Sequence, residues 1–362
     1  MSFKFMFDKM SVLGWKMAFL CSLVKPINHS PLKHSPYEIL EYKNKKQLPT
    51  HFRIEACTLC QLKCKECYMR KSEITKKLKC GKGYLKFKDF KKFCENNVVE
   101  SVALSNNGEI FLNPDLLKIM EYSYNHNIKL IDNNGVNFND VKEEVLEGLV
   151  KYEFEKLSIS LDGASQETYV QYRVGGNFDK VINNIKRVNY YKQKYNKEYP
   201  HIIWKFILFG HNEHEIPKAK EMAKELNCEI IFVPNWSPNF SPLKDIDFIK
   251  KELGNDAQIF IKDAYKTAAS NDWVPPCYQM WKEPQINYDG QLQGCCVYYD
   301  YDYGVNVFKD GLLKALNSKL FVDAKRAVSG YEPKYPDKLM CKKCRYYNAM
   351  KETGIYMVKG RK

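Results

Sequence analysis

The chain has 362 residues, of which 44% are hydrophobic and 28% charged, so it can bury a sizeable core and wholesale disorder is excluded. Its 57 Lys and Arg against 43 Asp and Glu give a formal net charge of +14. This charge favours acidic partners without choosing among phosphates, nucleic acid, acidic peptides and anionic membrane surfaces. No run of about 18 uncharged apolar residues is present, which argues against a membrane-spanning helix.

The chain has 13 cysteines but no clear secretory signal. The apolar segment 11–24 is interrupted by Lys16, and no small-residue cleavage site closes it. We therefore expect a location in the reducing cytoplasm, where clustered cysteines are more often metal ligands or catalytic thiols than disulfides.

The first 50 residues form an N-terminal extension with an expected amphipathic helix at about 3–24. From 51 to 235, β-rich runs alternate with helix-like segments. The β-rich runs are 51–56, 100–104, 128–132, 156–161, 202–208 and 229–233, and the helix-like segments lie near 87–97, 114–126, 139–150, 178–196 and 213–226. Such alternation predicts an α/β fold with a parallel sheet, either a barrel-like wrap or a doubly wound sheet. Six strands are fewer than the eight of a full barrel.

The alternation ends after Trp236. Residues 236–276 read as a linker loop followed by a helix around 244–269. Residues 277–350 hold short β-like pieces and one helix near 311–328, and we expect a small module that a metal cluster stabilises. A basic tail covers 351–362.

Three cysteines stand directly after the first predicted strand, with the spacing Cys60-x3-Cys64-x2-Cys67. Three thiolates at this spacing can hold three irons of a [4Fe–4S] cluster and leave the fourth iron open to another ligand. Cys57 offers a fourth thiolate, so a four-cysteine zinc or ferredoxin-type site is the alternative on spacing alone.

Short polar motifs follow the later strands in the same order as the strands themselves. They are Ser105-Asn-Asn-Gly108-Glu109, Asn134-Gly135, Ser158-Ile-Ser160-Leu-Asp162-Gly163 and Tyr172-Arg173. Together with the cysteine trio, this series resembles the radical S-adenosylmethionine (radical SAM) superfamily over residues 51–235. The chain departs from the family pattern at Asn107, where a glycine is usual, and at Glu66, where an aromatic residue usually packs near the adenine.

The resemblance implies a partial (β/α)6 TIM-like barrel as the radical SAM core. It implies that Cys60, Cys64 and Cys67 hold a [4Fe–4S] cluster that binds and cleaves SAM. It also implies a set of cofactor-binding residues on the motifs, namely Gly108, Glu109, Asn134, Ser160, Asp162 and Arg173. In relatives the turn equivalent to Gly108-Glu109 binds the methionine ammonium, the serine and aspartate lie near the ribose, and the arginine approaches the cofactor carboxylate.

The last quarter of the chain carries a second set of cysteines, namely Cys277, Cys295, Cys341 and Cys344. Four thiolates suit one fully ligated [4Fe–4S] cluster or a structural zinc. With Asp289-Gly290 as a hairpin turn, the spacing resembles the SPASM/twitch extension of radical SAM enzymes. No cysteine follows Cys344, so we expect the twitch-like version with a single auxiliary cluster, and we expect Cys296 to be a packing residue.

The resemblance implies reductive cleavage of SAM to a 5′-deoxyadenosyl radical that abstracts a substrate hydrogen. An electron donor such as flavodoxin or ferredoxin would reduce the first cluster, and the auxiliary cluster would accept an electron from the substrate radical. No general base can be named, so the catalytic residues stay unknown.

The short N-terminal extension and the basic charge favour a carbohydrate-like substrate, phosphorylated or linked to a nucleotide or lipid. One alternative is a peptide-modifying maturase. An alternative of another class is a zinc-stapled basic RNA-binding protein, but we expect no specific nucleic acid because its motifs are absent. The helix at 3–24 would allow peripheral membrane contact.

Overall fold

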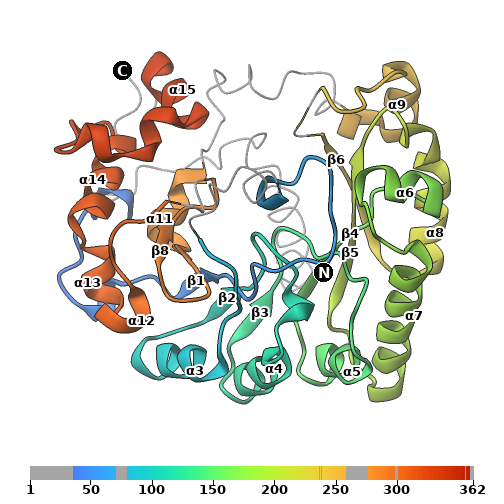
Figure 1. Ribbon diagram of the computed structural model, residues 1–362, viewed down its shortest axis with the longest axis horizontal. Coiled ribbons are helices and arrows are strands. Elements are labelled where there is room, and N and C mark those ends of the chain that lie inside the picture. Colours follow the sequence, from blue (N-terminus) through green and yellow to red (C-terminus); the bar gives the residue numbers. More distant parts are fainter. Residues whose placement is uncertain are drawn as a thin grey trace, which may run out of the picture.

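Figure 1 shows the computed structural model of the chain. The structure describes residues 36–70, 80–235, 237, 239–257, 276–297, 301–354 and 356–358. The expected helix at 3–24, the end of the basic tail and residues 258–269 of the segment expected to be helical at 244–269 lie outside the described residues.

One eight-stranded sheet organises the described part of the chain, with the strand order β6-β5-β4-β3-β2-β1-β7-β8. The first six strands are parallel to one another. They are β1 (His51–Ile54), β2 (Ser101–Ala103), β3 (Lys129–Ile131), β4 (Lys156–Ser160), β5 (His201–Leu208) and β6 (Glu229–Pro234). All six strands predicted from the sequence are confirmed, and the order is that of a partial (β/α)6 barrel.

Helices cover the outer face of this sheet (Figure 1). They are α3 (Phe87–Asn96), α4 (Leu116–Asn125), α5 (Glu143–Lys151), α6 (Gln166–Tyr172), α7 (Phe178–Tyr195) and α8 (Ile216–Glu225). Five of them match the predicted helical segments. The short α6 was not predicted, although Ser165 caps it by accepting from the Thr168 N–H.

The two faces of the sheet differ in polarity because side chains alternate along each strand. Phe52 of β1 faces the helices, since its ring lies 5.0 Å from that of Phe93 on α3. Its neighbour Arg53 therefore faces the barrel interior. In β4 the alternation places Leu157 with the apolar set and Ser158 with the polar set, and both are buried. The apolar outer face packs against the helices, and the polar inner face allows the barrel interior to bind a polar ligand.

The chain returns to the sheet after residue 276. Strand β7 (Gln285–Ile286) pairs in parallel with β1, and β8 (Leu292–Gly294) pairs antiparallel with β7. The predicted hairpin turn is confirmed, with Gly290 at φ 91°. The module expected at 277–350 thus extends the barrel sheet through its hairpin. Strands of two or three residues have no measurable periodicity, so this pairing could not be read from the sequence.

The rest of the C-terminal segment is helical. Its helices are α11 (Gln279–Lys282), α12 (Val307–Asp310), α13 (Leu312–Leu316), α14 (Lys319–Val328) and α15 (Arg345–Thr353). The single helix predicted near 311–328 is two helices, because the chain turns at Asn317. The Asn317 side chain accepts from the Tyr42 N–H and donates to the Tyr42 carbonyl, each at 2.8 Å. This contact holds the segment before β1 against α13 and α14.

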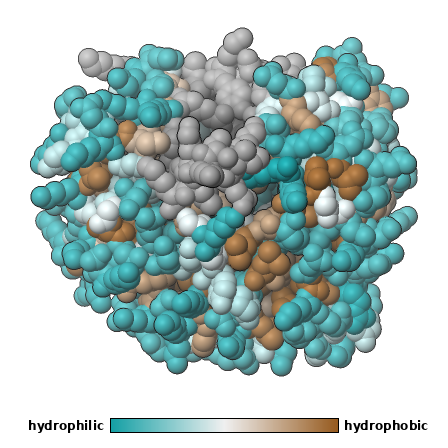
Figure 2. All heavy atoms as spheres, in the orientation of Figure 1, coloured by the Kyte–Doolittle hydropathy of each residue, from teal (hydrophilic) through white to brown (hydrophobic). Residues whose placement is uncertain are grey.

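Helix α9 (Ile246–Leu253) follows β6, within the range expected for the linker helix. None of the helices in the described ranges is long and apolar enough to cross a membrane. Most of the face shown in Figure 2 is hydrophilic, with smaller hydrophobic patches near its centre.

A lysine is buried where α14 meets the segment before β1. The Nζ of Lys325 lies 4.3 Å from the ring centroid of Tyr42 and 5.2 Å from that of Phe321, and the residue is 0% exposed. It has no hydrogen-bond partner among the described residues. Burial lowers the pKa of Lys325 from 10.5 to about 7.

We predict that Lys325→Met raises the free energy of unfolding at pH 7, by roughly 2–4 kcal/mol after allowance for the lost cation–π contacts. Between pH 7 and 10.5 the unfolded chain binds more protons than the folded one, so wild-type stability rises with pH and the gain shrinks. Urea unfolding at pH 7 and pH 9 measures both effects. Lys314→Met, at an exposed site on α13, is the control. A lower stability of Lys325→Met at pH 7 would contradict the prediction.

Candidate functional site

The cysteine trio lies on the loop that leaves the carboxyl end of β1. Cys64 is buried, Cys67 is half-buried and Cys60 is exposed. Two backbone hydrogen bonds hold this loop against the segment after α6, from the Lys63 N–H to the Val174 carbonyl at 2.9 Å and from the Lys65 N–H to the Tyr172 carbonyl at 3.3 Å. The loop is therefore tied to the motif that carries Arg173.

The three thiols influence one another electrically. Although Cys60 is exposed as a residue, desolvation of its thiol by the surrounding protein raises the pKa of Cys60 to about 12, and Glu109, Cys64 and Cys67 raise it further. Burial also raises the pKa of Cys64, and Cys67 adds to the effect while Arg173 opposes it. Three neighbouring thiols that disfavour one another's ionisation become thiolates when a bound cation compensates their charge. The donor set therefore fits the iron of a [4Fe–4S] cluster.

Cys57, the alternative fourth thiolate, points elsewhere. It is buried, and its backbone forms an antiparallel bridge with Tyr84. Its thiol donates to the Leu59 carbonyl with a sulfur–oxygen distance of 3.8 Å. Burial raises the pKa of Cys57 to about 12, and Glu55 and Glu109 raise it further. The cysteine trio does not contribute to this shift.

The motif after β2 packs directly on the cysteine loop. The Glu109 N–H donates to the Leu59 carbonyl at 2.7 Å. A Cβ at Gly108 would lie 2.2 Å from the Cys57 carbonyl oxygen and 2.6 Å from that of Leu59, so only glycine allows this approach. The amide nitrogen of Asn106 is buried and has no hydrogen-bond partner in the described part of the chain. The Asn107 side chain lies close enough to Glu55 to lower the pKa of that carboxyl. The buried Asn106 donor fits a turn that binds a polar ligand.

Buried carboxylates connect the loops at the carboxyl ends of β1 to β4. Each accepts a backbone N–H from the next strand or from its following loop. The pairs are Glu55 with Asn106 at 3.4 Å, Glu109 with Asn137 at 2.6 Å, Asp132 with Ser158 at 2.9 Å and Asp162 with Ile207 at 2.8 Å.

Glu55, Glu109 and Asp132 are costly to keep charged. Burial raises the pKa of Glu55 to about 8 and that of Glu109 to about 7, although the backbone N–H groups around them oppose the effect. Burial raises the pKa of Asp132 as well. Each group is retained against a desolvation cost because it holds a site loop in position.

The Asn134-Gly135 turn is held by Asp132 and faces β4. Both backbone N–H groups of the turn donate to Asp132 Oδ1, at 3.1 and 2.8 Å. Gly135 has φ 101°, and a Cβ there would lie 2.3 Å from Ser160 Oγ. The Asn134 side chain donates to the Asn106 carbonyl at 3.3 Å, so it joins two site loops to each other.

Asp162 and Arg173 pair with each other. The Arg173 Nε lies 2.5 Å from Asp162 Oδ2, and Nη1 lies 3.8 Å from Cys64 Sγ. Burial opposes the charge of Arg173, but Asp162 and Cys64 outweigh it and raise its pKa. The second Asp162 oxygen is occupied by the Ile207 N–H. The resemblance gave these two residues separate ligand contacts, whereas the structure makes the aspartate a support for the arginine.

Sequence reasoning missed two polar residues beside the site. Asn137 donates to Cys60 Sγ at 3.5 Å and exchanges amide hydrogen bonds with Gln61, each at 3.2 Å. Lys205, on β5, donates to the Asn134 carbonyl at 2.9 Å, and burial lowers its pKa to about 7. The sequence signal available for Lys205 was a lysine within an otherwise apolar strand. Asn137 gave no such signal.

The four C-terminal cysteines meet in a second place. Cys277, Cys295, Cys341 and Cys344 line one small cavity. Its other walls are apolar or aromatic side chains, including Met280, Val328, Tyr303 and Tyr347. Burial raises the pKa of Cys277, and the other three cysteines raise it further, so this set also fits a compensating metal cluster. Cys296 is not part of the lining; its N–H donates to the Gln279 side chain at 2.9 Å.

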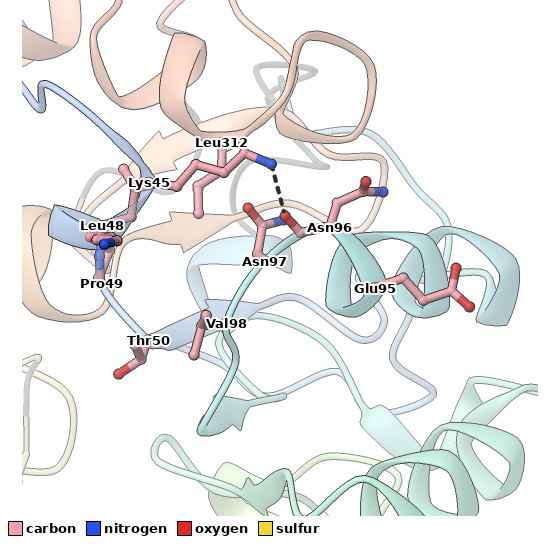
Figure 3. Close-up of a pocket in the computed structure, with 10 residues that line it drawn as sticks. Lys45, Leu48, Pro49, Thr50, Glu95, Asn96, Asn97, Val98 and Leu312 are labelled. Carbon is pink, nitrogen blue, oxygen red and sulfur yellow. Dashed lines mark hydrogen bonds between the residues drawn. The ribbon is translucent and has the colours of Figure 1, made fainter.

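No group of three His, Cys, Asp or Glu side chains in the described ranges is arranged to hold a single metal ion. Another hollow lies on the surface between the end of α3 and α13 (Figure 3). Lys45 crosses it and donates to the Asn96 carbonyl at 3.3 Å. Its lining contains lysines, asparagines and aliphatic side chains but no thiol, so this hollow is not a candidate site for an iron–sulfur cluster.

Known proteins are similar to this chain in sequence or in fold. No family model matches the chain. The bacteriocin (subtilosin) biosynthesis protein AlbA of Bacillus subtilis (strain 168) is 24% identical over 321 residues, which is 83% of this chain and 66% of AlbA. The chain thus spans slightly less than two thirds of this relative.

The crystal structure of Streptococcus suis SuiB bound to S-adenosylmethionine has a TM-score of 0.57 and 15% identity, over 78% of this chain and 68% of SuiB. The structure of SuiB bound to its precursor peptide SuiA has a TM-score of 0.55 and 16% identity, over 87% and 78% of the two chains. The shared fold is the one that the cysteine trio and the ordered turn motifs indicate. This chain shares the fold of SuiB, which confirms the partial barrel that the radical SAM resemblance implies.

We predict that changing Cys60, Cys64 and Cys67 to alanine removes one of two iron–sulfur clusters from the protein. Iron after anaerobic reconstitution should fall from about eight to about four per chain. Cys57→Ala is the matched control, because Cys57 is equally close in sequence but its thiol faces Leu59, and it should keep the wild-type iron. About one zinc with four irons would make the C-terminal site structural, and zinc without iron would remove the radical chemistry.

We further predict that Asp132→Asn lowers the free energy of unfolding by about 1–3 kcal/mol. In the wild type, the backbone N–H groups of Gly135 and Ser158 donate to the two oxygens of Asp132. In the variant, one of these oxygens becomes an NH₂ group, which donates and cannot accept. Asp179→Asn, at an exposed position of α7, should change stability by less than about 0.5 kcal/mol. Equal melting temperatures for the two variants would show that Asp132 does not hold the turn.

Proposed function

We propose that the protein is a radical SAM maturase that modifies a peptide. The observation that carries this is the relationship to AlbA, a bacteriocin biosynthesis protein, over 83% of the chain. The fold shared with SuiB, which was solved with its precursor peptide, supports it. These comparisons favour the peptide alternative over the carbohydrate-like substrate expected from charge and from the short N-terminal extension.

Cys60, Cys64 and Cys67 would hold the SAM-binding cluster, and the cofactor would lie over the turns that carry Gly108, Glu109 and Asn134. When bound, the reduced cluster and SAM supply a 5′-deoxyadenosyl radical that takes a hydrogen atom from the substrate, while the auxiliary cluster supplies an acceptor for the electron left behind.

The remaining tasks belong to the protein's own side chains. Arg173 has its Nε bound to Asp162 and its Nη1 directed at Cys64, which leaves Nη2 to meet the cofactor carboxylate. Asp162 is then a positioning residue. Ser160 lies buried beside Gly135, where its hydroxyl can meet the ribose. The closely packed carboxylates and turns exclude water from the reacting centre.

Cys277, Cys295, Cys341 and Cys344 would hold the auxiliary [4Fe–4S] cluster in their apolar cavity. A flavodoxin or ferredoxin would deliver the electron to the first cluster. A reducing cytoplasmic location stays a proposal that fits both clusters.

The test uses the reconstituted enzyme with SAM and dithionite. Synthetic peptides encoded beside its gene form one set of candidates, and nucleotide sugars form the other. We expect 5′-deoxyadenosine above background with a peptide, together with loss of two hydrogens from that peptide by mass spectrometry. The variant lacking Cys60, Cys64 and Cys67 is the control. Stimulation by nucleotide sugars alone would restore the carbohydrate reading.

A further inference from the structure

Three buried polar residues lie on neighbouring strands where the hairpin joins the barrel. Arg53 of β1 and Gln285 of β7 are register partners on neighbouring parallel strands, so their side chains lie on the same face. Phe52 packs on α3, which places that shared face inside the barrel. Gln293 of β8 lies between Leu292 and Gly294, which are the register partners of Ile286 and Gln285.

These side chains are buried without partners. Gln285 is 0% and Gln293 is 1% exposed, and both amide atoms of each have no hydrogen-bond partner among the residues that the structure describes. Arg53 is 7% exposed, and its Nε binds Glu283 at 3.2 Å while its Nη1 is unpartnered within the same ranges. Each such buried polar atom costs about 1–3 kcal/mol, so a cluster of them is kept for a reason other than stability.

The chain shows what a buried amide does when it has a suitable partner. Asn137 and Gln61 exchange two hydrogen bonds, each at 3.2 Å, between the carbonyl of one amide and the NH₂ of the other. A main-chain peptide group presents the same donor and acceptor. Two unpartnered glutamine amides and an arginine N–H are therefore complementary to a short stretch of peptide backbone.

The positions of Arg53, Gln285 and Gln293 in the fold are compatible with substrate binding. Gln293 precedes the auxiliary ligand candidate Cys295 by two residues, and Arg53 lies two residues before Glu55, at the start of the loop with the cysteine trio. Cys296 lies close enough to Arg53 to affect its pKa.

We infer that Arg53, Gln285 and Gln293 form a subsite that binds the main chain of the peptide substrate. This inference rests on the proposed function and adds the residues that recognise the peptide. The glutamine amides pair with peptide groups, and Arg53 donates from Nη1 to a main-chain carbonyl.

The experiment separates binding from folding. A capped random heptapeptide library is passed over immobilised, reconstituted enzyme with SAM, and retained peptides are identified by mass spectrometry. The dissociation constant of one retained peptide is then measured for the wild type and for Gln285→Leu and Gln293→Leu. We expect binding to weaken about tenfold or more in each variant. We expect melting temperatures equal to or above the wild type, because leucine removes a buried unpaired amide.

Gln279→Leu is the matched control. Gln279 is also buried, but its Oε1 accepts the Cys296 N–H, so its loss should lower the melting temperature and leave peptide affinity unchanged. Iron content is measured for every variant.

Unchanged peptide affinity in both glutamine variants would overturn the subsite while leaving the proposed function intact. Lower melting temperatures with unchanged affinity would show that the amides are structural and hydrated by buried water. A wild-type enzyme that retains no peptide would overturn the proposed function, and the subsite with it.

Discussion

The loops of the candidate site depend on carboxylates that are buried at the ends of the strands. Each one accepts a backbone N–H from the next strand or its loop, so the position of any loop depends on the strand before it. Glu55 and Glu109 stay buried although burial raises their pKa. The arrangement links β1 to β5 in order, which keeps the cysteine loop, the Gly108 turn and the Arg173 segment in contact without any of them being a regular element.

The polarity of the sheet explains where such a site can form. The outer face is covered by helices and buries large apolar residues such as Phe52 and Trp204. The inner face carries serine, lysine, arginine and glutamine side chains. In a closed barrel, hydrophobic side chains fill the interior. A partial barrel with a polar interior can take in a polar substrate, and a peptide is one that offers partners to both charged and amide groups.

The fold could be predicted because its signals are local. Each of the six parallel strands is a short β-rich run between helical segments, and the cysteine trio lies within eight residues of sequence, on one loop. The pairing of β7 with β1 could not be predicted, because two residues carry no periodic signal. The roles of Asp132 and Asn137 were hidden for a related reason. Their partners lie on other strands, and an isolated Asp or Asn after a strand looks like an ordinary turn residue.

The pairing of β7 with β1 has a consequence for how such enzymes diversify. The strand that leads to the first cysteine loop is also the strand on which the hairpin before Cys295 is built. The spacing between the two sets of thiols is thus set by backbone hydrogen bonds within one sheet, not by a linker. An exchange of the C-terminal segment between relatives would preserve that spacing only if the register of Arg53 with Gln285 were kept. Modularity in this architecture therefore has its boundary inside the sheet, where two residues of β1 pair with two residues of β7.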